Sequence, residues 1–92
     1  MQYSIILSHA ARKDLHALER QVARRIVKKL RFYAESKAPL EFAERLTDFS
    51  EGEYRFHIGM WRVTFDAEYV RNERCVLQIL VVDNRKDIYK KR

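Results

Sequence analysis

Apolar and polar residues alternate through residues 53–66 of this chain, and a period of two is typical of strands with one buried face. The alternation is interrupted once, at Gly59-Met60. Glycine in the first central position suits a two-residue type II′ turn, so the stretch predicts a β-hairpin. The apolar residues on one face of this hairpin are Tyr54, Phe56, Ile58, Trp61, Val63 and Phe65.

The predicted turn also determines which residues face each other across the hairpin. On the polar face, His57 lies opposite Arg62 and Arg55 lies opposite Thr64. A slip of one residue in one strand would mix the two faces, so this register is strongly preferred. The polar face therefore carries two guanidiniums and an imidazole, which makes it a candidate functional site. The apolar pairs expected in this register are Ile58 with Trp61, Phe56 with Val63, and Tyr54 with Phe65.

The segments before the hairpin predict one strand and a helical region. Residues 2–7 alternate apolar and polar side chains and predict a first strand. Ser8 can cap the helix that follows, because its hydroxyl can accept a free backbone N–H. Helical spacing then extends over residues 11–34, with a break expected near residues 19–21 that gives a helical hairpin, or else one bent helix. Pro39 ends the second helix, because proline disfavours the helical conformation in the residue before it.

The remaining segments complete the predicted fold. Residues 40–46 predict one short further turn of helix, and residues 47–52 predict a polar loop into the hairpin. After the hairpin the strand is expected to fray over residues 67–69, before a turn at residues 71–73. Residues 75–82 are almost continuously apolar, as expected of a strand that is central in a sheet or covered on both sides. The order predicts an α+β fold: an N-terminal strand, a helical hairpin and a three-stranded antiparallel meander, with the helices on one sheet face.

Length and composition limit the class of protein. A chain of 92 residues has room for one small domain with a single core, and we expect residues 1–92 to form it. Apolar residues make up 47% of the chain, which argues against disorder. Cys75 is the only cysteine, so an internal disulfide is excluded, and a free buried thiol suits a reducing cytoplasm. No signal peptide or membrane span is predicted, so we expect a cytoplasmic protein with no membrane partner.

Charge is distributed unevenly along the chain. The net charge of +6 favours an anionic partner, such as nucleic acid, an acidic protein or a membrane surface. Residues 12–31 contain eight basic and two acidic residues, and residues 85–92 contain five basic and one acidic residue. Residues 35–53 have the opposite balance, with six acidic and two basic residues. A solvated outer face explains the basic helices slightly better than a binding site does, whereas the basic tail adjoins the polar face of the sheet.

Several features of the sequence occur together in one known superfamily. The N-terminal strand is followed by Ser8-x-x-Ala11-x-x-Asp14-Leu15 and a basic helical hairpin. The hairpin motif Tyr-Arg-Phe-His-Ile-Gly-x-Trp-Arg-Val occupies residues 54–63, and Arg85-x-x-x-Tyr89 ends the pattern. This order and spacing resembles the RelE/ParE toxin superfamily over essentially the whole chain. The resemblance implies a RelE/ParE-like fold and a toxin of a type II toxin–antitoxin system.

The resemblance implies two alternative activities. RelE-like members are ribonucleases that cut messenger RNA, often in the ribosomal A site, whereas ParE-like members lack the nuclease residues and inhibit DNA gyrase. A basic interaction module that has lost toxic activity is a third alternative. The endoribonuclease is our leading hypothesis, and the gyrase inhibitor is the main rival. A cognate acidic antitoxin is the implied protein partner, with messenger RNA and the ribosome, or else gyrase, as the target.

The motif of RelE-like nucleases also implies a set of site residues. Two lysine positions of those enzymes fall on Arg55 and His57 in this chain. Asn84 stands where many relatives have a histidine, and asparagine cannot transfer a proton, so an acid or base must come from elsewhere. The candidate catalytic residues are Arg55, His57, Arg62, Arg85 and Tyr89.

These residue types suit RNA cleavage by the neighbouring 2′-hydroxyl without a metal. The reaction needs a base for the hydroxyl, an acid for the leaving 5′-oxygen and positive charge near the phosphate. Arginine is permanently charged and binds phosphate oxygens in a bidentate manner, which suits Arg62, Arg85 and Arg55 for the last task. The structural alternative is that these arginines pair with nearby carboxylates, with Asp66, Asp83 and Glu53 as the candidates.

Proton transfer is assigned to the remaining two candidates. His57 is the one group in the cluster that titrates near neutrality, and the nearby Arg62 would tend to lower its pKa. Tyr89 can stack on a base, carry a proton, or pack on the sheet. His9 and His16 are expected on the surface, and no Cys/His spacing suggests zinc, so we expect no metal or cofactor.

Overall fold

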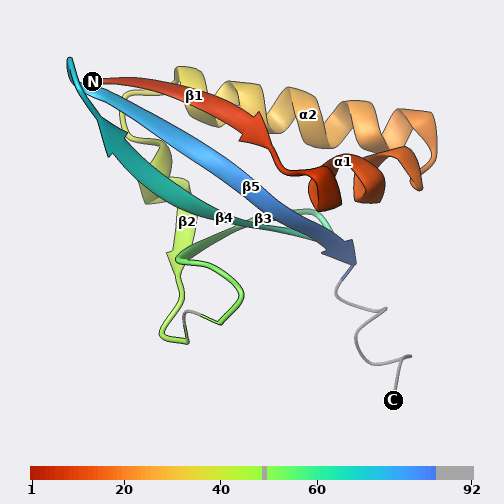
Figure 1. The fold of residues 1–92 in the computed structure, drawn as a ribbon. Coiled ribbons are helices and arrows are strands. Elements are labelled where there is room, and N and C mark those ends of the chain that lie inside the picture. Colours follow the sequence, from red (N-terminus) through yellow and green to blue (C-terminus); the bar gives the residue numbers. More distant parts are fainter. Residues whose placement is uncertain (49, 85–92) are drawn as a thin grey trace.

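Two helices lie along one face of a single five-stranded sheet (Figure 1). The computed structural model describes residues 1–48 and 50–84. The elements in chain order are β1 (Gln2–Leu7), α1 (His9–His16), α2 (Arg20–Glu35), a 3₁₀ helix η1 (Pro39–Phe42), β2 (Ala43–Arg45), β3 (Tyr54–Ile58), β4 (Trp61–Val70) and β5 (Arg74–Asn84).

The sheet has the strand order β1-β5-β4-β3-β2. β1 runs parallel to β5, and the other neighbouring pairs are antiparallel. The parallel pair is possible because the two helices and the antiparallel strands separate β1 from β5 in sequence. The predicted α+β fold is confirmed, and so is the central position of the apolar C-terminal strand, which pairs with β1 on one side and β4 on the other.

The junction between β1 and α1 explains two residues of the sequence motif. The Ser8 hydroxyl caps α1 by accepting a hydrogen bond from the Ala11 N–H at 3.0 Å, as predicted. The same hydroxyl donates to the carbonyl of Leu80 at 3.0 Å. One turn later the Asp14 carboxylate accepts the Val82 backbone N–H at 2.9 Å. Ser8 and Asp14 therefore fix α1 against β5, where the pairing of β5 with β1 has ended.

The β3–β4 hairpin has the register that the sequence predicts. All five expected pairs are present, including His57 with Arg62 and Arg55 with Thr64. Gly59 has a φ of 61°, and Met60 is not among the described residues with positive φ, which fits a type II′ turn. The turn therefore places the whole apolar set of the hairpin toward the helices.

The core is formed where α2 crosses this apolar face. Ile26, Leu30 and Tyr33 are the buried residues of α2. The ring of Tyr33 stacks on Phe56 at 4.4 Å between centroids, and Phe56 stacks on Phe65 at 4.4 Å. Both phenylalanines are completely buried. The other fully buried side chains near them belong mainly to β4 and β5: Val63, Cys75, Leu77 and Ile79.

Three boundaries differ from the sequence prediction. The short helix ends at Phe42, and residues 43–45 pair with β3 as the edge strand β2, so the prediction of helix through residue 46 was wrong. Strand β4 does not fray at residue 67, because it stays paired with β5 as far as Val70. The helix break lies at residues 17–19, slightly earlier than predicted. Long-range pairing overrides the weak local preferences in each strand case.

The single cysteine and the helices complete the description. Cys75 is buried, and burial raises the pKa of its thiol, so the thiol is unreactive at neutral pH. Trp61 is partly buried against the core, as its parity predicts. Within residues 1–48 and 50–84, each helix is too short or too polar to cross a lipid bilayer.

Candidate functional site

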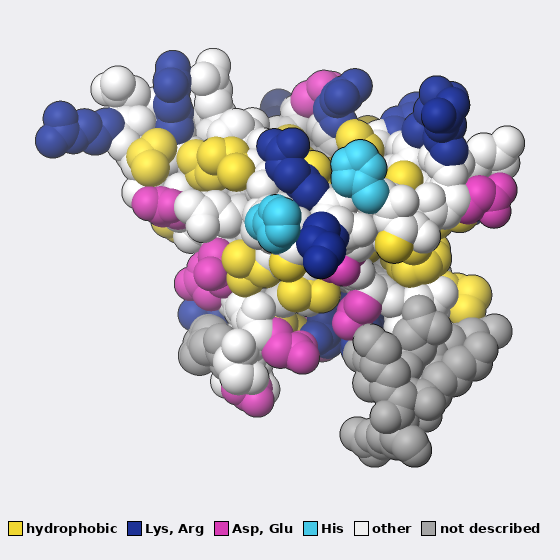
Figure 2. Space-filling view, turned by 45° about the vertical axis from the view of Figure 1, so that its right-hand side comes forward, with side chains coloured by type: hydrophobic (Ala, Val, Ile, Leu, Met, Phe, Trp, Pro, Cys, Tyr) yellow, Lys and Arg dark blue, Asp and Glu magenta, His cyan; other side chains and the backbone are white. Residues whose placement is uncertain are grey.

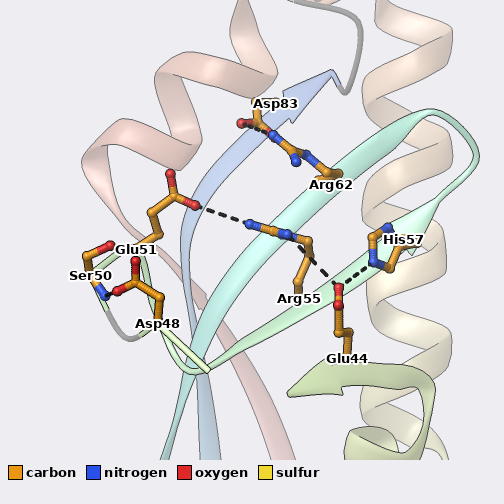
Figure 3. A network of polar contacts seen from close by, with 8 residues as sticks. All are labelled: Glu44, Asp48, Ser50, Glu51, Arg55, His57, Arg62 and Asp83. Carbon is orange, nitrogen blue, oxygen red and sulfur yellow. Dashed lines mark hydrogen bonds and ion pairs between the residues drawn. The ribbon is translucent and has the colours of Figure 1, made fainter. Parts of the chain in front are cut away.

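The polar face of the hairpin brings three predicted site residues together. Arg55 and His57 come from β3 and Arg62 comes from β4, and their side chains lie on the side of the sheet away from the helices (Figure 3). Only 16% of the Arg55 and Arg62 side chains is exposed, whereas 53% of His57 is exposed. The other two predicted residues, Arg85 and Tyr89, lie outside the described residues.

Arg62 is held by the neighbouring strand. Asp83 on β5 is its direct cross-strand partner. Nε and one terminal nitrogen of the guanidinium donate to the two Asp83 carboxylate oxygens, each at 3.3 Å. This bidentate geometry fixes the plane of the guanidinium. Asp83 was one of the structural partners considered from the sequence, and the structure contains that ion pair.

Arg55 lies between two carboxylates (Figure 3). One terminal nitrogen donates to Glu51 Oε2 at 3.1 Å, and the other lies 4.0 Å from Glu44 Oε1. Its Nε is buried and has no hydrogen-bond partner among the described residues. The buried Nε is not accessible to a substrate, so any further acceptor would bind at the terminal nitrogens, one of which has only the weak contact with Glu44.

His57 has a partner that the sequence did not indicate. Its Nε2 lies 2.9 Å from Glu44 Oε1, and Glu44 comes from the edge strand β2. The hydrogen bond with His57 is the main cause of a lowered pKa of the Glu44 carboxyl, and Arg55 and Arg62 lower it further. The prediction for His57 considered only the cation Arg62. The structure adds a carboxylate, which was missed because residues 40–46 were predicted to be helical.

The loop between β2 and β3 folds over part of this polar face, on the side of the sheet opposite the helices (Figure 1). Gly52 is buried there, and a Cβ at this position would lie 2.8 Å from Thr64 Cγ2. Thr64 is consequently only 3% exposed, although it belongs to the polar set of the hairpin. Glu53 anchors the end of the loop, because its N–H donates to Asp66 Oδ1 and its carboxylate accepts the Ala67 N–H. The loop therefore places the Glu51 carboxylate beside Arg55.

Among the described residues, the charges on the polar face are balanced rather than strongly basic. The two guanidiniums of Arg55 and Arg62 contact three carboxylates, those of Glu44, Glu51 and Asp83. Such partly exposed ion pairs contribute about 0–1 kcal/mol each, so a competing anion can displace them at low cost. Among the described residues there is no cluster of three or more His, Cys, Asp or Glu side chains suited to a metal ion.

The basic side chains of the described surface are concentrated elsewhere. In the space-filling view, Lys and Arg side chains spread over the upper part of the molecule, where the helices lie, and most acidic side chains lie lower (Figure 2). This distribution follows the sequence, in which residues 12–31 are basic and residues 35–53 are acidic. The helices therefore present a basic surface to a polyanion. The arginines on the polar face of the hairpin are instead paired with carboxylates.

The fold is shared with a chain of a toxin–antitoxin complex of known structure. A chain in the crystal structure of the toxin–antitoxin complex RelBE2 from Mycobacterium tuberculosis has the same fold, with a TM-score of 0.69 at 24% sequence identity. The match covers 92% of this chain and 100% of that chain. No curated protein sequence matches.

The family follows from the sequence itself. The family model for the ParE toxin of the type II toxin–antitoxin system parDE matches residues 5–89. The chain therefore belongs to the ParE toxin family, and it is a type II toxin of the RelE/ParE superfamily.

Proposed function

We propose that this toxin is an endoribonuclease that cleaves messenger RNA through attack by the 2′-hydroxyl. The observation that carries the proposal is the position of Arg55, His57 and Arg62 on one side of the β3–β4 hairpin. Two guanidiniums supply positive charge near the phosphate and the imidazole can transfer a proton, so the described residues offer two of the three requirements of this reaction, with Tyr89 as the candidate for the second proton transfer.

The arginines have the phosphate-binding role. In the free protein they are held by Glu44, Glu51 and Asp83, which fix their orientation before substrate arrives. A phosphate then replaces the carboxylates on the guanidiniums, because arginine binds phosphate oxygens in a bidentate manner. In this proposal Arg85 adds a further cation, and Tyr89 stacks on a base or carries a proton.

His57 has the proton-transfer role. Its Nε2 is held by Glu44, and its Nδ1 has no protein partner among the described residues. The ring is about half exposed, so Nδ1 is accessible to a substrate on the polar face. Since the Glu44 carboxylate accepts from Nε2–H, the neutral ring keeps its proton on Nε2 and presents Nδ1 as the nitrogen that exchanges a proton with substrate.

A second candidate is inhibition of DNA gyrase without catalysis. It is favoured by the family description, which is that of the ParE toxin, and by the carboxylates that already neutralise Arg55 and Arg62. For either activity we propose a cognate antitoxin as partner, since the structurally similar RelBE2 protein was solved as a toxin–antitoxin complex. The basic surface of the toxin suits an acidic antitoxin.

A primer-extension map of messenger RNA after brief induction of the toxin tests the proposal. Discrete new 5′ ends are expected for the wild type and for His9→Gln, which alters an exposed histidine outside the site. His57→Gln should lower the cleavage rate more than RNA binding, because it keeps polarity and removes the titrating group. Intact RNA together with trapped gyrase–DNA breaks would instead select gyrase inhibition.

A further inference from the structure

The two edges of the sheet differ in how they are shielded. At one edge, β2 has only three residues, and two of them, Glu44 and Arg45, are charged. At the other edge, β1 has six residues, and residues 2–7 include no charge and no proline. The pairing of β1 with β5 runs over all six residues without a register shift. Folded proteins shield a free strand edge by shortness, charge, proline or a bulge, so β1 is open to pairing with another strand.

The free edge of β1 presents the backbone groups of every second residue. The N–H groups of Gln2 and Ser8 donate toward β5, to the carbonyls of the residue before β5 and of a residue within it, at 2.8 and 2.9 Å. Successive residues of a strand point their backbone groups to opposite sides, so Tyr3, Ile5 and Leu7 direct theirs away from β5. β1 is the outermost strand of the described sheet, so these groups have no strand partner.

An apolar groove runs beside the same edge, between β1 and α2. It has a volume of about 460 Å³. Its strand side includes the apolar side chains of Ile5 and Leu7, and its helix side carries Arg31 and Glu35 together with three apolar residues. On the opposite face of β1, the side chain of Ile6 is 54% exposed. A strand added here would therefore find apolar surface on both of its faces. We refer to the free edge of β1 together with this groove as the β1 edge.

We propose that the β1 edge binds the β1 edge of a second copy of this chain, which joins the two sheets in a two-fold dimer. A strand that pairs with itself across a two-fold axis is antiparallel. With Ser4 on the axis, Tyr3 of each copy faces Ile5 of the other, and these residues carry the free backbone groups. The side chains of both residues line the groove, so in the dimer they fill the grooves between β1 and α2. This inference does not depend on the nuclease activity.

Charge complementarity favours a second copy as the occupant. Arg31 and Glu35 are exposed, and neither has an ion-pair partner among the described residues. The helix α2 runs antiparallel to β1 (Figure 1), and these two residues lie one turn apart in the groove beside Ser4. A two-fold axis through Ser4 therefore brings Arg31 of each copy toward Glu35 of the other, because every contact in such an interface occurs twice. The dimer would pair four charges that the single chain leaves unpaired.

The position of the β1 edge leaves the candidate site open. β1 lies at the opposite edge of the sheet from β3 and β2. Pairing through β1 would therefore leave Arg55, His57 and Arg62 of both copies uncovered. Dimer formation should not by itself block the polar face.

The first test is sedimentation equilibrium of the purified full chain over a range of concentrations. It is done at physiological ionic strength, which screens the repulsion between two chains of net charge +6. We expect a monomer–dimer equilibrium. Ser4→Lys places two ammonium groups opposite each other and should raise the dimer Kd by at least about tenfold. Thr47→Lys is the matched control, an exposed hydroxyl changed to lysine beyond the other edge strand, and should stay within about twofold of the wild type.

Cysteine cross-linking tests the register. Residues that face each other at a non-hydrogen-bonded pair have Cβ atoms about 4.5–5.5 Å apart, which is near the reach of a disulfide. Ser4→Cys should therefore cross-link two copies under mild oxidation. Ile6→Cys is the matched control on the same strand, because Ile6 would face Gln2 of the other copy, and it should stay largely reduced. The native Cys75 is buried and does not compete.

Charge reversal tests the proposed ion pairs. Arg31→Glu should raise the dimer Kd, because it brings two carboxylates together at each pair. Adding Glu35→Arg in the same chain restores opposite charges and should recover much of the loss.

Three results would overturn the proposal: a chain that stays monomeric at all concentrations, a dimer that Ser4→Lys does not weaken, or cross-linking of Ile6→Cys as fast as that of Ser4→Cys. Circular dichroism and the unfolding midpoint establish that each variant is folded. If Ser4→Lys does not fold, the charge reversals on α2 and the cross-linking still decide. Cleavage of messenger RNA is measured separately, so failure of the nuclease proposal would leave the dimer result unchanged.

Discussion

The two faces of the β3–β4 hairpin share one register but differ in how they are stabilised. The apolar face is buried against α2, and its rings stack on one another from Tyr33 through Phe56 to Phe65. The polar face is held by ion pairs with carboxylates from three other segments: β2, the loop after it, and β5. Packing of apolar side chains against α2 holds the first face, whereas ion pairs with residues of β2, the loop after it and β5 hold the second.

This difference separates stability from function within one hairpin. Burial of large apolar side chains contributes several kcal/mol per residue, whereas partly exposed ion pairs contribute about 0–1 kcal/mol. Changes on the apolar face should therefore unfold the protein. Changes on the polar face should leave it folded and alter what it binds, which makes the polar face open to functional variation.

The largest expected loss of stability comes from the apolar face. Phe65→Ala removes a fully buried ring and should lower the free energy of unfolding by about 3–5 kcal/mol. Tyr69→Ala is a matched truncation on the same strand, where the ring is 60% exposed, and should cost much less. Urea unfolding followed by circular dichroism measures both. Similar losses for the two variants would contradict the assignment of the core.

An intermediate effect is expected where the loop after β2 covers the polar face. Gly52 has a φ of 155°, and an added Cβ would lie 2.8 Å from Thr64 Cγ2 and 3.1 Å from Leu80 Cδ1. Gly52→Ala should therefore destabilise the protein by about 1–3 kcal/mol. Thr64→Ser removes the closest methyl group, so in the Gly52→Ala background it should restore part of the loss. If the two changes are simply additive in a double-mutant cycle, this contact is not the cause.

A small change in stability with a large change in function is expected at Arg62. Arg62→Ala breaks the ion pair with Asp83, in which both side chains are partly exposed, and should cost about 0–1 kcal/mol. Under the nuclease proposal toxicity should be abolished, because the guanidinium proposed to bind phosphate is lost. Arg62→Lys keeps the charge but loses bidentate geometry and should restore toxicity only in part. Growth assays on induction measure toxicity, with the exposed Arg71→Ala as control; a fully toxic, folded Arg62→Ala protein would reject the site.

The comparison of the two faces also shows what could be predicted from the sequence. The strict alternation of residues 53–66 specified the hairpin, its turn and all five strand pairs, because the side-chain period of a strand is two. The edge strand β2 was not predictable in the same way. Its three residues, Ala-Glu-Arg, have little strand preference and are ordered only by pairing with β3.

The candidate site could also be predicted only where it lies within one local element. The sequence placed Arg55, His57 and Arg62 together on the polar face of one hairpin, and the structure confirms that position. It could not identify Glu44 and Glu51 as their partners, because these belong to a short strand and a loop whose positions depend on tertiary structure. A functional site built within one local element can be predicted from periodicity, whereas its electrostatic environment requires the fold.

The smallest expected effect concerns the hydrogen bond between Glu44 and His57 on the polar face. The pKa of Glu44 lies below its ordinary value of 4.5, first because of the hydrogen bond with His57. A carboxyl whose pKa is lower in the folded than in the unfolded protein stabilises the fold above its unfolded pKa, and this contribution is lost as the pH falls through the folded pKa. Wild type should therefore exceed Glu44→Gln in stability above about pH 4.5, and the difference should shrink toward more acidic pH.

Urea unfolding midpoints between neutral and acidic pH test this expectation, with Glu41→Gln in the adjacent 3₁₀ helix as the control for loss of one carboxyl. The His57→Gln background separates the causes. If the hydrogen bond with His57 is the main one, Glu44→Gln should have a smaller pH-dependent effect in that background than in the wild type. An equal effect in both backgrounds would mean that Arg55 and Arg62, and not His57, are the main cause of the lowered pKa of Glu44. Glu44 would then orient the guanidiniums rather than the imidazole.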